Sequence, residues 1–258
     1  GDFKGGALML LDTSGAIIHT RDLREIATDT SFFVNSIISG GEGTGKFFIS
    51  GSTSKVDGSI GRTPAWALCD VNDTQLIKYI RYTEYAIGST ADPQTYDEYE
   101  AGWLDIGLIK YDSATSTHEI ILGGKKEDVS LTAGASDTAL SMMGERGHTS
   151  FALLQKAKIA DSAAYSVDVL WTKQIASGKG YMEEINSVLV EDSDSRPWWF
   201  FEDEEFHNGN HRVIFTGTGL NLDSSAGTLM RADTLIGGVN TNDGSLYFHS
   251  SLGHMGED

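Results

Sequence analysis

The sequence predicts a single all-β domain built from repeated groups of short strands. Short apolar runs that end in turn-forming residues fill most of the chain, 30 glycines stand against only 3 prolines, and two sequence phrases recur. All-β domains of about 200 to 250 residues often fold as one unit. We therefore expect residues 1–258 to form one all-β domain.

Near the N-terminus, two predicted strands flank a tight turn. Residues 7–11 form an apolar run that stops at Asp12, and the apolar pattern resumes at residues 16–18 after Gly15. Aspartate and glycine provide the backbone conformations that a turn between antiparallel strands requires. Residues 46–51 predict a further strand, which ends at a glycine.

One recurring phrase is an apolar strand that ends in aspartate and leads through a polar turn into a second strand. Residues 67–80 and 107–121 follow it closely, 227–233 repeat its first half, and 151–154 are a looser version. The aspartates that mark these units are unevenly spaced, at Asp12, Asp70, Asp112, Asp161 and Asp233. The uneven spacing does not fix the number of units.

A second phrase sets the order of strands within a unit. Asn35 and Asn186 each begin an Asn-Ser-apolar strand, and Gly51 and Gly217 lie near the end of the strand that follows. The aspartate-ended strand and an outgoing strand come next. Units of several short strands that repeat every roughly 40 to 70 residues are typical of β-propellers.

These units resemble the β-propeller repeats that are common in extracellular proteins of bacteria and archaea. The similarity lies in residues 8–15, 49–54, 108–112, 171–173 and 214–218. The resemblance implies a small β-propeller of about five blades, in which the last strand, near residues 246–248, pairs beside the first. A β-sandwich or jelly roll, which also consists of many short strands, is the alternative fold. We expect helical turns only at residues 136–144 and 23–27.

The charge balance restricts the partners. With 37 acidic and 19 basic residues, the formal net charge is −18. Nucleic acid and anionic membranes both attract basic residues, so we expect neither as a partner. No apolar run approaches the roughly 18 residues that span a bilayer, so we expect no membrane insertion. The acidity favours an extracellular, cell-surface or virion location, although acidic cytosolic proteins share it. The chain begins at Gly1, so any signal peptide is already removed.

The strongest candidate for a ligand site is a cluster of aromatic and acidic residues late in the chain. Sugar rings stack on tryptophan, and carboxylates and imidazoles bond to their hydroxyl groups. We predict a glycan-binding site at Trp198, Trp199, Glu202, Glu204 and His207. A packed loop is the alternative, because alternate residues of an extended segment face opposite sides.

Two motifs suggest phosphate or zinc but are better interpreted as turns. Gly40–Lys46 fits the spacing of a phosphate-binding loop, yet Phe47 follows where serine or threonine would hold magnesium, and the next residues predict a strand. The motif therefore predicts a glycine-rich hairpin. His207 and His211 are four residues apart, but Asn-Gly-Asn between them predicts a turn rather than a zinc-binding helix.

The remaining candidates concern calcium and the single thiol. Residues 192–195 and 240–244 are rich in oxygen ligands but lack the spacing of a calcium loop, and the second predicts a hairpin turn. We predict no cofactor, with calcium as the candidate metal and no residues assigned to it. Cys69 lies in an apolar stretch, where a free thiol behaves as a small buried hydrophobe.

Taken together, the sequence predicts a non-catalytic extracellular or virion-type β-propeller module that binds a glycan or protein surface or associates with copies of itself. No serine lies in a Gly-x-Ser-x-Gly motif. One alternative is a carbohydrate-active enzyme, a glycosidase or lyase, on a propeller scaffold; three convergent acids at the central channel would favour it. Another alternative is a structural subunit of a filament or shell.

Overall fold

The computed structural model describes residues 6–24, 30–55, 63–82, 102–128, 149–161, 165–175, 180–191, 212–222 and 230–252. Every regular element within these residues is a β-strand, which confirms the all-β prediction. The strands are β1 (Ala7–Leu11), β2 (Ile17–Asp22), β3 (Thr30–Ser39), β4 (Lys46–Lys55), β5 (Thr63–Asp70), β6 (Ile77–Tyr82), β7 (Gly102–Asp112), β8 (Thr117–Asp128), β9 (Thr149–Ala160), β10 (Ser166–Ile175), β11 (Gly180–Glu191), β12 (Arg212–Leu222), β13 (Met230–Asn240) and β14 (Leu246–Leu252).

Consecutive strands pair antiparallel to form four meanders. We name them meander A (β1–β2), meander B (β3–β6), meander C (β7–β10) and meander D (β11–β14). One parallel bridge between Met182 and Ser150 joins β11 to β9, so hydrogen bonds run continuously through meanders C and D as one eight-stranded sheet. Within the described residues β14 pairs only with β13, so the expected pairing of residues 246–248 beside the first strand is wrong.

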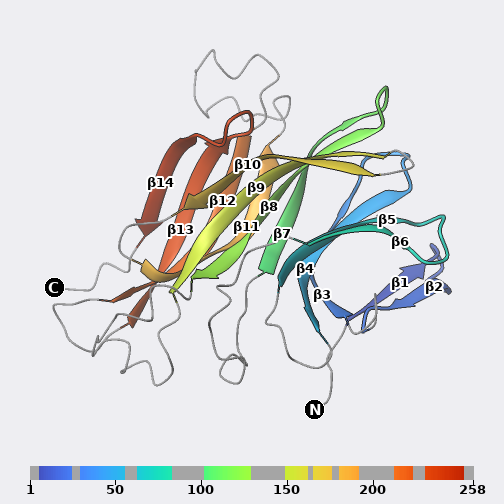
Figure 1. Ribbon diagram of the computed structural model, residues 1–258, viewed down its shortest axis with the longest axis horizontal. Coiled ribbons are helices and arrows are strands. Elements are labelled where there is room, and N and C mark those ends of the chain that lie inside the picture. The colour runs from blue at the N-terminus through green and yellow to red at the C-terminus, as the bar shows by residue number, and fades with distance from the viewer. Residues whose placement is uncertain are drawn as a thin grey trace.

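The meanders stack in chain order, with an apolar core at each interface (Figure 1). Between meanders A and B lie Leu8, Leu23, Phe32, Ile49, Ala65, Ala67, Cys69 and Leu76. Between B and C lie Phe48, Trp66, Leu68, Trp103, Ile106, Ile120, Leu122, Leu153, Ala157 and Ile159. Between C and D lie Ile109, Ile121, Ala152, Leu154, Ile175, Ile185, Val188, Val213, Phe215, Leu235 and Val239.

Strand β5 shows why the sequence of a strand in an inner meander is a continuous apolar run. Its residues from Pro64 to Cys69 are all buried, because Trp66 and Leu68 face meander C while Ala67 and its alternating neighbours face meander A. A strand with a packed layer on each side loses the polar alternation of a half-exposed strand.

Meanders B, C and D share a backbone device in their first two strands. The first strand carries one extra, bulged residue, which is Asn35, Leu104 and Asn186 in turn. The second strand places a glycine opposite the bulge, at Gly51, Gly124 and Gly217. A Cβ atom there would lie 1.8, 2.1 and 1.9 Å from the carbonyl oxygens of Phe33, Gly102 and Glu184. The backbones approach so closely that only glycine fits.

The aspartate landmarks are only partly in the expected places. Asp70 ends the third strand of meander B, and Asp161 follows the third strand of meander C. Asp112 ends β7, a first strand, so the predicted repeat was two strands out of phase there. Asp233 lies inside β13, which continues to Asn240. Asn240 occupies the turn after β13 in place of an aspartate. Its Oδ1 atom accepts a hydrogen bond from the Asn242 amide at 2.8 Å, as aspartate does in the other turns.

Only Leu23 and Arg24 of the two predicted helical segments are described. Leu23 lies outside any helix and is buried, and its amide donates to the carbonyl of Gly6 at 3.0 Å. Residues 25–27 and 136–144 lie outside the described residues. In the described part of the chain there is no helix long and apolar enough to cross a membrane.

Candidate functional site

The predicted glycan site lies outside the described residues. Strand β11 ends at Glu191 and β12 begins at Arg212, and the segment between them contains Trp198, Trp199, Glu202, Glu204, His207 and His211. Residues 192–195 belong to the same segment. Glycan binding and calcium binding there remain predictions.

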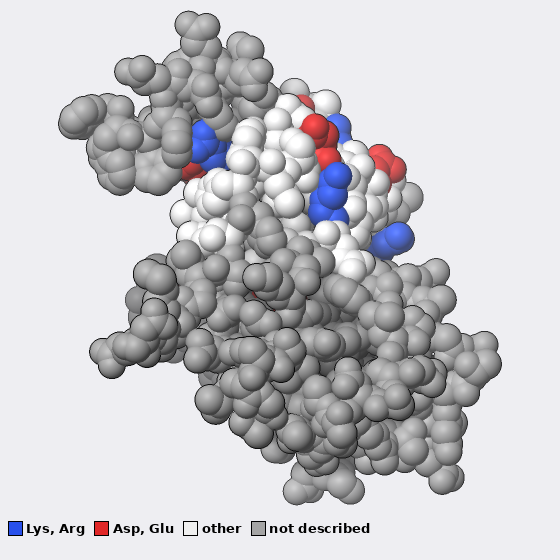
Figure 2. All heavy atoms as spheres, turned by 90° about the vertical axis from the view of Figure 1, so that its left-hand side faces the viewer, with Lys and Arg blue, Asp and Glu red and all other residues white. Residues whose placement is uncertain are grey.

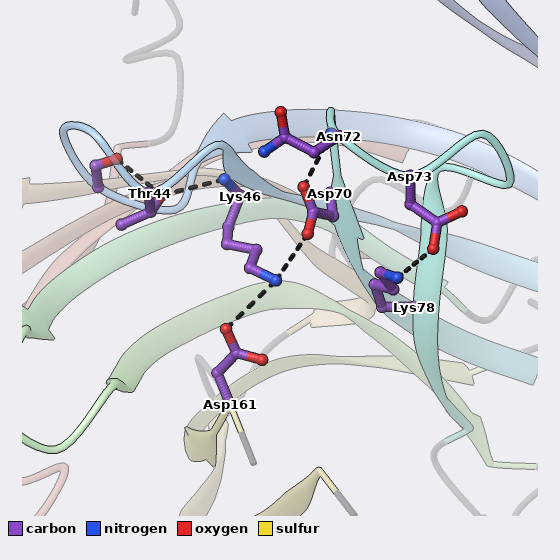
Figure 3. A network of polar contacts seen from close by, with 8 residues as sticks. Thr44, Lys46, Asp70, Asn72, Asp73, Lys78 and Asp161 are labelled. Carbon is purple, nitrogen blue, oxygen red and sulfur yellow. Dashed lines mark hydrogen bonds and ion pairs between the residues drawn. The ribbon is translucent and has the colours of Figure 1, made fainter. Parts of the chain in front are cut away.

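The Gly40–Lys46 motif forms the predicted hairpin between β3 and β4. Backbone angles φ of +117°, +71° and +64° at Gly41, Gly43 and Gly45 explain its glycines, since other residues rarely adopt them. The Lys46 Nζ atom lies 2.9 Å from a carboxylate oxygen of Asp70 and 3.3 Å from one of Asp161 (Figure 3). The lysine is thus used to join two carboxylates and not to bind phosphate.

This ion-pair cluster links two meanders. Lys46 and Asp70 belong to meander B, and Asp161 follows β9 of meander C. Burial opposes the charge on Lys46, but its bonds to the two carboxylates outweigh burial and raise its pKa. Burial likewise opposes the charge on Asp70, yet the hydrogen bond from Lys46 lowers its pKa on balance. Each charge is therefore stabilised by its partners.

A buried histidine lies beside this cluster. The His118 ring packs against Phe48 and Tyr111, with centroids 5.2 and 4.6 Å away. Burial lowers the pKa of His118, which outweighs the opposing effect of the Asp161 carboxylate. The backbone of Gly40 also opposes this lowering of the pKa, but neither ring nitrogen has a partner in good hydrogen-bond geometry. His118 therefore fills space as a neutral ring.

A second polar cluster joins the first strands of meanders B, C and D. Asp105 of β7 accepts hydrogen bonds from the hydroxyl of Ser36 in β3, at 2.7 Å, and of Ser187 in β11, at 3.0 Å. The amides of Val188 and Ile106 also donate to it, each at 2.9 Å. One carboxylate thus connects three meanders through four donors, which is strong charge-assisted bonding.

The sequence contained a signal for this cluster that the strand prediction missed. Aligned on their bulges, the three first strands read Val-Asn-Ser-Ile, Trp-Leu-Asp-Ile and Ile-Asn-Ser-Val, so Asp105 occupies the position of Ser36 and Ser187. Among the described first strands this position holds one acid between two serines. The three convergent acids that would favour an enzyme are therefore not found in these strands.

Other predicted features are confirmed as structural. Cys69 is buried, and burial raises its thiol pKa to about 12, which keeps the thiol protonated and inert. Residues 240–244 form the hairpin between β13 and β14, with a positive φ at Gly244. No group of three or more metal-binding side chains occurs among the residues that the structure describes.

The stacked meanders leave an apolar surface bare at the end of the series. We call the side of a meander that faces the next one its front face. In each meander, the third residue after the bulge lies on the front face. Ile38 at this position packs into the B–C core, and Gly107 lies under Val188 and Val190 of meander D. The equivalent residue of meander D, Leu189, is 63% exposed.

The rest of that front face is also largely uncharged. Val213 and Phe215 of β12 face the core, so alternation places Ile214 and Thr216 on the front face. Phe248 of β14 lies over Gly238 on the same side and is exposed. Figure 2 shows the side of the molecule where β13 and β14 lie, and residues other than Lys, Arg, Asp and Glu make up most of its described surface, with a few charged side chains among them.

Comparison with known proteins gives no assignment: no family model and no curated protein sequence matches the chain. The front face of meander D and the polar clusters are thus the features from which function is inferred. The Lys46 and Asp105 clusters both hold meanders together, which leaves the bare front face as the candidate functional site within the described residues.

Proposed function

We propose that the chain is an open arc of a β-propeller, a non-catalytic extracellular or virion-type module that self-assembles through the front face of meander D. Four-stranded antiparallel meanders that stack in chain order are the arrangement of propeller blades. The repeated bulge and its opposing glycine support the interpretation of meanders B, C and D as equivalent blades. The acidic composition supports the extracellular location.

The observation that carries the proposal is the exposure of Leu189. The residues at the same position in the two preceding meanders are packed against the next meander, whereas Leu189 meets solvent. A leucine buried from an exposed position contributes about 1.5 to 3 kcal/mol. An uncovered sheet face of this kind is typical of an association surface.

The net charge of −18 modulates such an association. Copies of the chain repel one another at long range, and salt screens this repulsion, with a Debye length of about 10 Å at 0.1 M and about 3 Å at 1 M. Because the front face itself is mainly uncharged, added salt removes repulsion without weakening the contact. We expect association to strengthen as the sodium chloride concentration rises.

Light scattering of the purified chain over a range of concentrations tests the proposal. The wild-type mass should rise above 27.9 kDa with concentration, and Leu189→Lys should prevent the rise because it would bury an unpaired charge. Leu170→Lys is the matched control, since Leu170 is also an exposed leucine on a strand, at 45%, but lies on β10. A wild-type chain that stays at 27.9 kDa up to millimolar concentration contradicts the proposal.

A further inference from the structure

We infer that the front face of meander D binds the outer face of meander A in a second copy of this chain, so that copies associate head to tail. This inference rests on the proposed function and adds the partner and its orientation.

The internal interfaces show that each meander has two different faces. Two residues after the bulge, Ile106 faces back into the B–C core and Val188 faces back into the C–D core. One residue further, the side chain faces forward, as Ile38 does towards meander C. Each interface between the described meanders therefore joins the front of one meander to the back of the next. The same rule predicts a back face as the partner of meander D.

The outer side of meander A is a whole back face that the stack leaves bare among the described meanders. Leu8 and Leu10 of β1 pack against meander B, so alternation points Met9 and Leu11 away from it. Ile17 of β2 pairs directly with Leu11 and shares its side. Met9, Leu11 and Ile17 are all exposed. These side chains form an apolar patch on the back face, and the one charged residue that strand pairing places on this side of β1 and β2, Asp22, is paired with Arg24.

The inner end of meander B is also uncovered, because meander A has only two strands. Ile37 stands where Ile106 and Val188 stand in the next two meanders, yet it is 58% exposed while they are 2% and 8% exposed. In the stack, meander A covers β4, β5 and the first half of β3, where Phe32 is buried in the A–B core. Ile37, in the second half of β3, thus adds apolar surface on the same side of the molecule as meander A.

Each copy therefore carries one bare front face and one bare back face, at opposite ends of the series of meanders (Figure 1). A contact between two different faces is heterologous, and it forms a closed ring when the rotation between copies closes and a filament when it does not. Both faces carry exposed apolar side chains, Leu189 on the front face and Met9, Leu11 and Ile17 on the back face, so a second copy covers both without any further component.

Two variants and their mixture test the orientation. Leu189→Lys damages the front face and Ile17→Lys the back face, so each variant alone should remain at 27.9 kDa by light scattering. Mixed in equal amounts, they keep one intact front and one intact back face and should form a dimer of twice that mass. The double variant carries both changes and should stay monomeric in every mixture. Recovery of the dimer on mixing also shows that both variants are folded.

The results separate the two proposals. If Leu189→Lys prevents association but Ile17→Lys associates as the wild type does, two front faces bind each other, and the head-to-tail inference is wrong while the proposed function stands. If both variants are monomeric and mixing restores nothing, the inference is also wrong. A wild-type monomer at all concentrations overturns both.

Discussion

Replacing Gly217 by alanine tests whether the bulge-and-glycine pair defines the repeated unit. The added Cβ would lie 1.9 Å from the carbonyl oxygen of Glu184 and 3.1 Å from the Cα of Ile185. Both atoms belong to the bulged backbone of β11, so no side-chain rotation relieves the overlap. The two strands must separate or the bulge must be lost.

The magnitude follows from this contact. Overpacking a well-ordered interior costs about 1 to 3 kcal/mol, and a disrupted backbone hydrogen bond adds about 1 kcal/mol. We expect Gly217→Ala to lower the free energy of unfolding by about 3 kcal/mol. At about 2 to 4 °C per kcal/mol for a domain of this size, the melting temperature should fall by roughly 10 °C.

Gly219 provides the control in the same strand. The nearest atom to a Cβ there is the Glu183 Cγ, at an ordinary 3.6 Å. Gly219→Ala should be neutral or stabilise the protein by about 0.4 to 1 kcal/mol, because alanine restricts the unfolded chain. Urea unfolding followed by tryptophan fluorescence measures both variants. Equal midpoints for Gly217→Ala and Gly219→Ala would refute the steric reasoning.

Two further predictions concern the polar groups between meanders. Asp105→Asn should lower the free energy of unfolding by about 2 kcal/mol, because the amide turns an N–H group towards the backbone donor of Ile106 or Val188. Ser36→Ala removes only one donor and should lower the free energy of unfolding by about 1 kcal/mol. Equal losses for the two changes in urea unfolding would argue against the four-donor arrangement. Burial lowers the pKa of His118, although Asp161 opposes the effect and Lys46 adds to it. As the pH drops through 6.5, His118 therefore takes up a proton in the unfolded chain before it does so in the folded protein, and the free energy of unfolding should fall. His118→Phe keeps a ring between its aromatic neighbours and should make this part of the pH dependence shallower; an unchanged slope between pH 7 and 5 would contradict a buried neutral imidazole.

The sequence predicted the order of strands well in meanders B and D. The Asn-Ser strand, the glycine-containing strand and the turn residues were found because backbone geometry requires them. Gly51 and Gly217 must lack a Cβ atom, and Asp70 must accept a backbone hydrogen bond at its turn. Residues whose identity is fixed by the backbone leave a pattern in the sequence.

Meander C was assigned out of phase because its residues satisfy the same geometry with different letters. Leu104 replaces asparagine at the bulge, and Asp105 replaces serine beside it. Gly124 precedes a lysine rather than serine or threonine, so it did not match the expected phrase. The run from Gly107 to Asp112 then resembled a third strand, although it ends a first strand.

The bare faces could not be predicted from the residues that form them. Ile38, Gly107 and Leu189 hold the same place in their meanders, and the most exposed of the three, Leu189, belongs to the meander that lacks a successor. Whether such a residue is buried depends on what packs against it. Meanders B and C pack the residue at this position against the next meander, so the exposed Leu189 indicates that meander D lacks such a neighbour. The matching back face lies on meander A of the same chain, and this pairing makes a second copy the simplest partner to test.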